Sequence, residues 1–264
     1  MYEAIELQRR GAAAIVRLNR PDNLNAWNEA LGIELLDAVR SIADDEAVRA
    51  VCVTGAGRAF SSGADLRDLG ARALTPEGHV DVHTVLTQTY QPILNGLRTM
   101  PKPVVAAING PAVGIGCSLA LSCDLVVAAE SAYLLLGFVN IGLVPDGGAT
   151  ALIAARAGVG RAAAMAMLGE RITAPEAQRW GLVNTVLPDD AFDAGVSDLV
   201  DRLAAGPTRA YAGTKRQLNA WMYSGLDEQF DLEARLQQEM AASQDFTEGV
   251  SAFLHKRDAV FDGR

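Results

Sequence analysis

The sequence predicts an α/β fold in which parallel strands alternate with helices, followed by a region made of helices alone. A unit of short apolar run, small-residue loop and apolar helix recurs, which is typical of parallel strands joined by crossover helices. No strand pattern follows Pro188. The composition changes near Gly206, which predicts a core of residues 1–205 and a helical region of residues 206–264.

The first elements expected are two short strands within residues 5–18, joined by a turn at Gly11. Asn25 follows as the expected N-cap of a helix that runs to about residue 41, since Asn is a preferred cap residue. The apolar run at residues 50–54 then predicts a buried strand.

The same unit recurs in the middle of the chain. Residues 94–99 predict the end of a helix that stops at Pro101, and residues 104–108 predict a second buried strand. A helix over residues 117–122 and a strand over residues 125–128 complete the unit.

The last third is predicted to be mostly helical. Residues 145–167 form an Ala-rich helical pattern interrupted by glycines, and residues 174–180 form a helix closed by Gly181. Residues 183–186 predict the last strand, before helices over residues 192–205 and 208–260.

Composition excludes several classes of protein. The net charge of the 264 residues is −9 and there are only three lysines, which disfavours binding to nucleic acid or to an anionic membrane. No apolar run reaches the roughly 20 residues of a membrane span. The three cysteines, Cys52, Cys117 and Cys123, form no CxxC pair, and the N-terminus lacks the pattern of a signal peptide. These features predict a cytoplasmic protein with reduced, buried cysteines.

Two glycine-rich loops, at residues 55–65 and 109–116, each follow a predicted buried strand and lead towards a helix. Such loops can aim backbone N–H groups into a cavity, and one N–H from each could form an oxyanion hole. The alternative is that both are only tight turns. The first loop is not a dinucleotide-binding fingerprint, because Phe60 stands where the third glycine is required.

Individual polar residues each allow two interpretations. Asp146 precedes a predicted helix, so it is either an N-cap or a general base. His79 and His83 have the i, i+4 spacing of a metal pair, but no third ligand accompanies them, so no metal is expected. Ser118 lacks the frame of a nucleophilic serine, which favours a packing role in a helix.

Taken together, motifs along nearly the whole chain resemble the crotonase superfamily, the enoyl-CoA hydratase/isomerase family. In order, they are LNRP (18–21), LNA (24–26), AFSSGADL (59–66), PKPVVAAING (101–110), LALSCD (119–124), IGLVPDGG (141–148), GERI (169–172), WGLVN (180–184) and FLHKR (253–257). The resemblance implies a crotonase-like spiral of ββα units with a C-terminal helical trimerisation region.

The resemblance also implies the chemistry. Members of the family act on acyl-CoA thioesters through a thioester enolate, so no cofactor is needed besides the coenzyme A of the substrate. By position, the oxyanion donors carry over to the backbone N–H groups of Ala64 and Ile115. The coenzyme A site carries over to Ala64, Asp65 and Leu66, with Phe253 and Lys256 reaching it from the C-terminal helix.

The sequence departs from the hydratase pattern at both glutamates, whose positions hold Ser118 and Phe138. Hydration needs a base for water and an acid for the α-carbon, and both are missing. The surroundings of Asp146 instead resemble the isomerase branch, and within it the ring-epoxide isomerases of phenylacetyl-CoA catabolism. We therefore expect an enoyl-CoA isomerase with Asp146 as acid/base. The alternatives are a hydratase with a non-standard acid/base, drawn from the loop around Asp81 or His83, and a non-catalytic acyl-CoA-binding protein.

A homotrimer or hexamer is expected as well. The C-terminal region carries apolar residues that would form a stripe in need of a partner surface: Leu226, Phe230, Leu232, Leu236 and Met240. The charged residues between them are expected to lie on the solvated side of the same helix.

Overall fold

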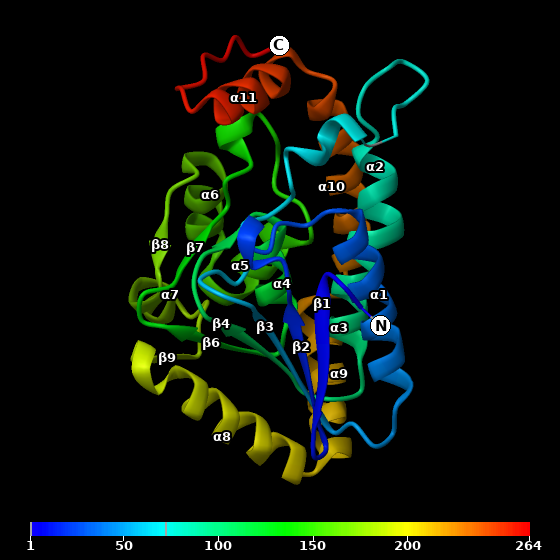
Figure 1. Ribbon diagram of the computed structural model, residues 1–264, viewed down its shortest axis with the longest axis vertical. Coiled ribbons are helices and arrows are strands. Elements are labelled where there is room, and N and C mark those ends of the chain that lie inside the picture. Colours follow the sequence, from blue (N-terminus) through cyan, green and yellow to red (C-terminus); the bar gives the residue numbers. More distant parts are fainter. Residues whose placement is uncertain (1, 72) are drawn as a thin grey trace.

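The computed structural model describes residues 2–71 and 73–264, and its centre is a mostly parallel sheet (Figure 1). The strand order is β1-β2-β3-β4-β6-β9, and only β1 pairs antiparallel with its neighbour. These strands are β1 (Ile5–Arg10), β2 (Ala13–Leu18), β3 (Ala50–Gly55), β4 (Val104–Ile108), β6 (Leu125–Ala129) and β9 (Thr185–Leu187). A second sheet comprises β5 (Ala112–Val113), β7 (Tyr133–Leu135) and β8 (Ile172–Thr173).

Helices surround the sheet. They are α1 (Glu29–Asp44), α2 (Val82–Val85), α3 (Gln91–Thr99), α4 (Ile115–Ser122), α5 (Ala149–Ala157), α6 (Val159–Leu168), α7 (Ala174–Trp180), α8 (Phe192–Ala205), α9 (Thr208–Met222), α10 (Leu226–Ala241) and α11 (Gln244–His255). A π-helical segment (Leu86–Tyr90) joins α2 to α3, and short 3-10 turns occur at Pro21–Asn23, Asp68–Ala71, Val139–Ile141 and Asp189–Ala191. In Figure 1, α8 crosses below the sheet while α1, α3 and α10 stand together beside it.

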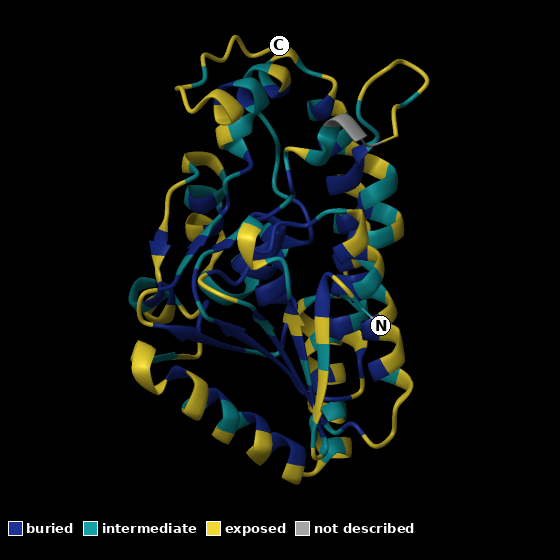
Figure 2. Ribbon diagram, viewed as in Figure 1, coloured by how far each residue is buried: buried dark blue, intermediate teal, exposed yellow. Residues whose placement is uncertain are grey.

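The predicted α/β architecture is confirmed, and the strands at residues 50–54, 104–108 and 125–128 are correct to within one residue. Figure 2 shows β3, β4 and β6 as largely buried in the centre of the molecule, as their apolar runs predict. The second sheet was not predicted, because strands of two or three residues are too short to show an alternating pattern. One of them, β5, lies inside the expected loop at residues 109–116.

Asn25 does not cap a helix, which corrects the prediction. Helix α1 begins four residues later, and its cap is Asn28, whose side chain accepts a hydrogen bond from the Leu31 N–H at 3.0 Å. Asn25 is instead fully buried in the left-handed conformation, with φ of 55°. Its amide accepts from the Arg20 N–H at 2.9 Å and donates to the Ala59 carbonyl at 2.8 Å, so it holds the first glycine loop in place.

This difference between the two asparagines predicts unequal losses of stability. Asn25→Ala leaves buried backbone groups without partners and should lower the free energy of unfolding by about 3 kcal/mol. Asn28→Ala removes only a helix cap and should cost about 1 kcal/mol. Urea denaturation of both variants at neutral pH checks the ranking, which equal losses would contradict.

Several helix boundaries differ from those expected. Helix α4 begins at Ile115, two residues before the expected start, and α5 begins at Ala149, four residues after it. The second difference follows from Gly147 and Gly148, which both have positive φ, 66° and 72°, a conformation that is incompatible with a right-handed helix before Ala149. Asp146 therefore lies in a loop, and the residue that caps α5 is Gly148.

Two of the three lysines have structural roles. The Lys215 ammonium donates to the Leu97 carbonyl at 2.6 Å and pairs with Asp124 at 2.8 Å. Burial lowers the pKa of Lys215, and the Asp124 carboxylate opposes that shift. Lys102 donates to the Asp45 carbonyl at 2.7 Å, close to the end of α1. Only Lys256 remains as an exposed lysine.

The three cysteines are free and buried, as predicted. Among residues 2–71 and 73–264, no helix combines the length and apolar character needed to cross a membrane.

The apolar residues of α10 do not form the expected exposed stripe. Leu226 and Phe230 are buried in the core of their own chain, because α10 packs against the π-helical segment and α2. Of the other three residues, Leu232 is exposed, and Leu236 and Met240 are half-buried. The exposed large apolar side chains of residues 206–264 are spread over α9, α10, α11 and the C-terminal tail, and they include Trp221, whose side chain is 84% exposed. The charged stretch of α10 is also not wholly solvated, since Glu233 is buried.

Candidate active site

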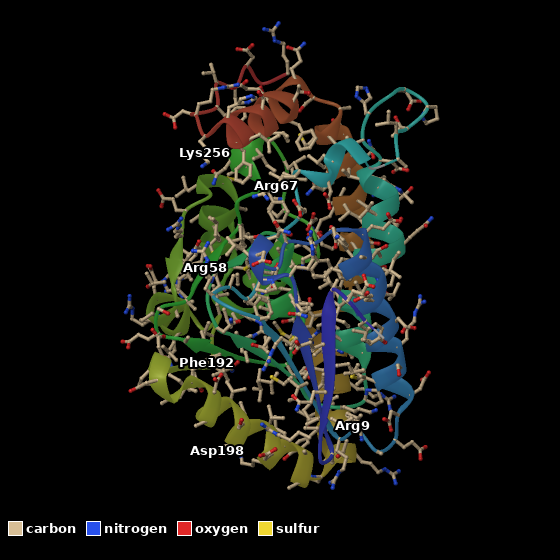
Figure 3. The ribbon with its side chains drawn as sticks, in the orientation of Figure 1. Arg9, Arg58, Arg67, Phe192, Asp198 and Lys256 are labelled. Atoms are coloured by element: carbon tan, nitrogen blue, oxygen red, sulfur yellow. The ribbon has the colours of Figure 1, made fainter. Side chains whose placement is uncertain are left out.

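A cavity of about 610 Å³ lies where the two glycine loops meet the segment that contains Asp146. Its walls also include residues of α10, α11 and the π-helical segment, so the cavity draws on both the sheet core and the C-terminal helices. In Figure 3, Arg67 is labelled just beneath α11 and Arg58 further down the molecule.

The two glycine loops are in direct contact. Val113 donates its N–H to the Ser61 carbonyl at 2.9 Å, and a Cβ atom on Gly116 would lie only 2.6 Å from the Ser61 Cβ. Gly63 has a φ of 93°, and a Cβ there would lie 3.1 Å from the Val113 carbonyl oxygen. Glycine is therefore required on both sides of the contact. The two loops form one packed unit, so the alternative that they are only separate tight turns is wrong.

The backbone N–H groups of Ala64 and Ile115 both belong to residues that line the cavity. On either side of Ala64, the Gly63 carbonyl and the Asp65 N–H are bonded to Trp27 at 2.8 and 2.9 Å. Within the described part of the chain the Ala64 N–H has no acceptor. Ile115 is the first residue of α4, so its N–H has no partner inside the helix and stands at the positive end of the helix dipole.

Asp146 lines the same cavity and is 7% exposed. Its carboxylate Oδ2 accepts a hydrogen bond from the Gln237 amide at 3.0 Å, and its own backbone carbonyl accepts from the Ser118 hydroxyl at 2.8 Å. Because the cap of α5 is Gly148, the N-cap interpretation of Asp146 is wrong.

Ser118 and Phe138 have the surroundings of structural residues. Ser118 is fully buried, and its hydroxyl is bound to the backbone of Asp146, which agrees with a packing role in α4. Phe138 lines the cavity with an aromatic ring. Neither side chain can exchange a proton with water near neutral pH.

The expected coenzyme A residues divide into two groups. Asp65, Leu66 and Phe253 line the cavity, although the Asp65 carboxylate is bound to Arg20 at 3.1 Å. Lys256 is not part of the lining. It ends α11 in the left-handed conformation, with φ of 54°, and is exposed (Figure 3).

Three arginines that the sequence analysis missed line the cavity: Arg58, Arg67 and Arg257. Arg257 is bound to the half-buried Glu248 carboxylate at 2.7 Å, and this hydrogen bond is the largest cause that lowers the pKa of Glu248 to about 2. Arg58 and Arg67 have no ion pair with a described residue. Arg58 lies inside the first glycine loop and Arg67 just after it, and this placement could have indicated from the sequence that both belong to the site.

His79 and His83 belong to a different place. They line a separate hollow of about 470 Å³ together with Glu77 and Glu239. Over the described ranges, no three His, Cys, Asp or Glu side chains are arranged to hold a metal ion. Asp81 caps α2 by accepting from the Thr84 N–H at 2.9 Å. Neither Asp81 nor His83 lines the cavity that holds Asp146.

Comparison with known proteins agrees with this arrangement. The family model described as enoyl-CoA hydratase/isomerase matches residues 8–264. A probable enoyl-CoA hydratase of Rhodobacter capsulatus is 43% identical, with 100% of this chain and 99% of the relative covered. The 1,2-epoxyphenylacetyl-CoA isomerase of Escherichia coli is 38% identical, with 94% of each chain covered.

Among solved structures, an enoyl-CoA hydratase from Mycobacterium avium subsp. paratuberculosis superimposes with a TM-score of 0.90 at 38% identity, covering 99% of each chain. The predicted crotonase-like fold with its C-terminal helices is confirmed. The chain therefore belongs to the enoyl-CoA hydratase/isomerase family, within the crotonase superfamily.

Proposed function

We propose that this enzyme moves a double bond along the acyl chain of an enoyl-CoA, with Asp146 as the single acid/base. The observation that carries the proposal is that the buried Asp146 shares one cavity with the Ala64 and Ile115 amides, while Ser118 and Phe138 occupy the positions of the hydratase glutamates. Of the other carboxylates in the lining, Asp65 is bound to Arg20, and Asp22 and Asp258 are exposed to solvent.

The reaction follows from these groups. The thioester oxygen of a 3-enoyl-CoA accepts hydrogen bonds from the Ala64 and Ile115 N–H groups, which stabilise the negative charge that develops there. The Asp146 carboxylate removes a proton from C2, and the electron pair of the C–H bond spreads over the dienolate. Asp146 then returns the proton at C4, which leaves the double bond between C2 and C3.

Hydration is the second candidate, because the Rhodobacter capsulatus relative is called a probable enoyl-CoA hydratase. It requires a second acid/base to activate water, and Ser118 and Phe138 cannot supply one. Incubation with a panel of 2-enoyl- and 3-enoyl-CoA thioesters separates the two reactions. Isomerisation leaves the mass unchanged and moves the double bond, whereas hydration adds one water. Rapid hydration of crotonyl-CoA would favour the hydratase over the isomerase. Absence of turnover with every thioester of the panel would favour a non-catalytic acyl-CoA-binding protein.

The phosphates of coenzyme A require positive charge in a chain whose net charge is −9. We propose that Arg58 and Arg67 supply it, since both line the cavity and neither pairs with a described carboxylate. Leu66 and Phe253 would contact the adenine and pantetheine portions. Lys256 would contact coenzyme A only if α11 shifts or if a neighbouring subunit approaches. The latter would occur in the trimer or hexamer that the family resemblance implies.

Replacement of both arginines by glutamine should raise the KM for an acyl-CoA about tenfold at low salt, equivalent to about 1.4 kcal/mol of binding free energy. The kcat should change little, because the phosphates lie far from the reacting carbons. The matched control is the double variant Arg40→Gln with Arg209→Gln, which removes the same charge from exposed positions outside the cavity lining. Equal KM values for the two double variants would contradict the assignment.

A further inference from the structure

Gln237 connects helix α10 to the acid/base. The side chain is 1% exposed, and its amide nitrogen donates to the Asp146 Oδ2 at 3.0 Å and to the Val144 carbonyl at 2.7 Å. Both partners are acceptors, so the orientation of the amide is fixed by chemistry. The remaining atom, Oε1, is buried and has no hydrogen-bond partner among the described residues.

The same helix holds the other side of the Asp146 loop. Glu233 lies one turn before Gln237, and its carboxylate accepts from the Gly148 N–H at 2.7 Å and from the Thr150 hydroxyl at 3.2 Å. Two buried polar side chains of α10 therefore bind the loop two residues before and two residues after Asp146. In Figure 1, α10 runs alongside α2 and α3, within the C-terminal region for which an oligomerisation role was expected.

We infer that Gln237 is a positioning residue, which fixes the Asp146 carboxylate for proton transfer. The inference rests on the proposed function of Asp146. A misplacement of about 1 Å at a reacting group can lower the rate about 10²-fold. Loss of the hydrogen bond that Gln237 donates to Oδ2 can therefore have a large effect on kcat. A packing role alone does not explain an amide here, because a buried acceptor without a partner lowers stability by about 1–3 kcal/mol.

Gln237→Met tests the inference, since methionine keeps the length and volume of the side chain and removes both hydrogen bonds. We expect kcat to fall about 10–100-fold with little change in KM. The hydrogen bond favours the ionised form of Asp146, so its loss should also move the acidic limb of the kcat profile to higher pH. A merely structural role would alter thermal stability without moving that limb.

Gln229→Met is the matched control on the same helix. Gln229 also donates two hydrogen bonds, to Thr150 at 3.0 Å and to Glu233 at 3.1 Å, and it lies outside the cavity lining. Burial raises the pKa of Glu233 and the hydrogen bond from Gln229 lowers it, so this variant should raise that pKa further. We expect the acidic limb of the kcat profile to move in Gln237→Met and to stay in place in Gln229→Met. Movement of the limb in Gln229→Met would show that it follows the ionisation of Glu233, which would contradict the inference.

The outcomes separate the two claims. If Asp146→Asn is inactive while Gln237→Met keeps both kcat and the pH profile, the positioning role is wrong and the proposed function stands. If Asp146→Asn is fully active, the proposed function itself fails. Should Gln237→Met not fold, Gln237→Glu preserves the shape and sets a carboxylate against Asp146, and an unchanged profile in that variant would equally overturn the inference.

Discussion

Asp146→Asn should lower the rate of isomerisation by roughly 10²–10⁴-fold while acyl-CoA binding is retained. Asparagine has the size of aspartate and still accepts the hydrogen bond that Gln237 now donates to Oδ2. The geometry of the loop is therefore preserved, and only the capacity to take and return a proton is lost. Steady-state turnover of a 3-enoyl-CoA, with a separate binding titration, measures both quantities.

The control for this prediction is Asp81→Asn, which exchanges a carboxylate for an amide at the N-cap of α2. Asparagine caps a helix as well as aspartate does, so stability and turnover should stay near those of the wild-type enzyme. A rate for Asp146→Asn within a few-fold of wild type would show that another group moves the proton.

Ile115→Pro should lower kcat by about 10²–10³-fold, equivalent to about 2.7–4 kcal/mol of barrier. Proline removes the backbone N–H, which is the group proposed to bind the enolate oxygen. The position tolerates the change better than most, because Ile115 is the first residue of α4 and proline is favoured at the first position of a helix. Turnover should therefore fall in a protein that still folds.

Ile115→Val is the matched control, because valine is close to proline in volume and keeps the N–H. It should retain most of the activity, although it also trims a side chain that packs near Gly147. Circular dichroism verifies the fold of both variants. Comparable kcat values in the folded proline and valine variants would contradict the oxyanion hole.

Those parts of the site that lie on local motifs could be predicted from the sequence. Each glycine loop follows a strand, and Asp146 precedes a helix. The local pattern of residue types is sufficient to predict positions of this kind. The structure brings them together because β3 and β4 are parallel neighbours, so that the loops after both strands emerge at the same edge of the sheet.

Contacts between distant segments could not be predicted in this way. Gln237 is 91 residues from Asp146 in the chain, and nothing in its own surroundings indicates the contact. A signal was nonetheless present, since Glu233 and Gln237 continue the helical spacing of the buried Leu226 and Phe230. Their polarity led to the expectation of a solvated face, whereas burial with hydrogen-bond partners is what the structure shows.

Asn25 illustrates a second limit. Its residue type is typical of a helix cap, and a cap was expected, but asparagine is also one of the few residues that tolerate the left-handed conformation. The choice between these roles depends on Ala56 and Ala59, whose carbonyls receive its amide hydrogens from across the first glycine loop.

The fate of one hydrogen tests the central claim, that a single carboxylate removes a proton and returns it to the same substrate. A 3-enoyl-CoA carrying deuterium at C2 is converted in a single turnover, and the product is analysed by NMR. If Asp146 alone carries the proton, part of the deuterium should appear at C4 of the 2-enoyl product, with no water added. A product that carries an added hydroxyl, or an isomer with no deuterium at C4 even at the earliest times, would contradict the account.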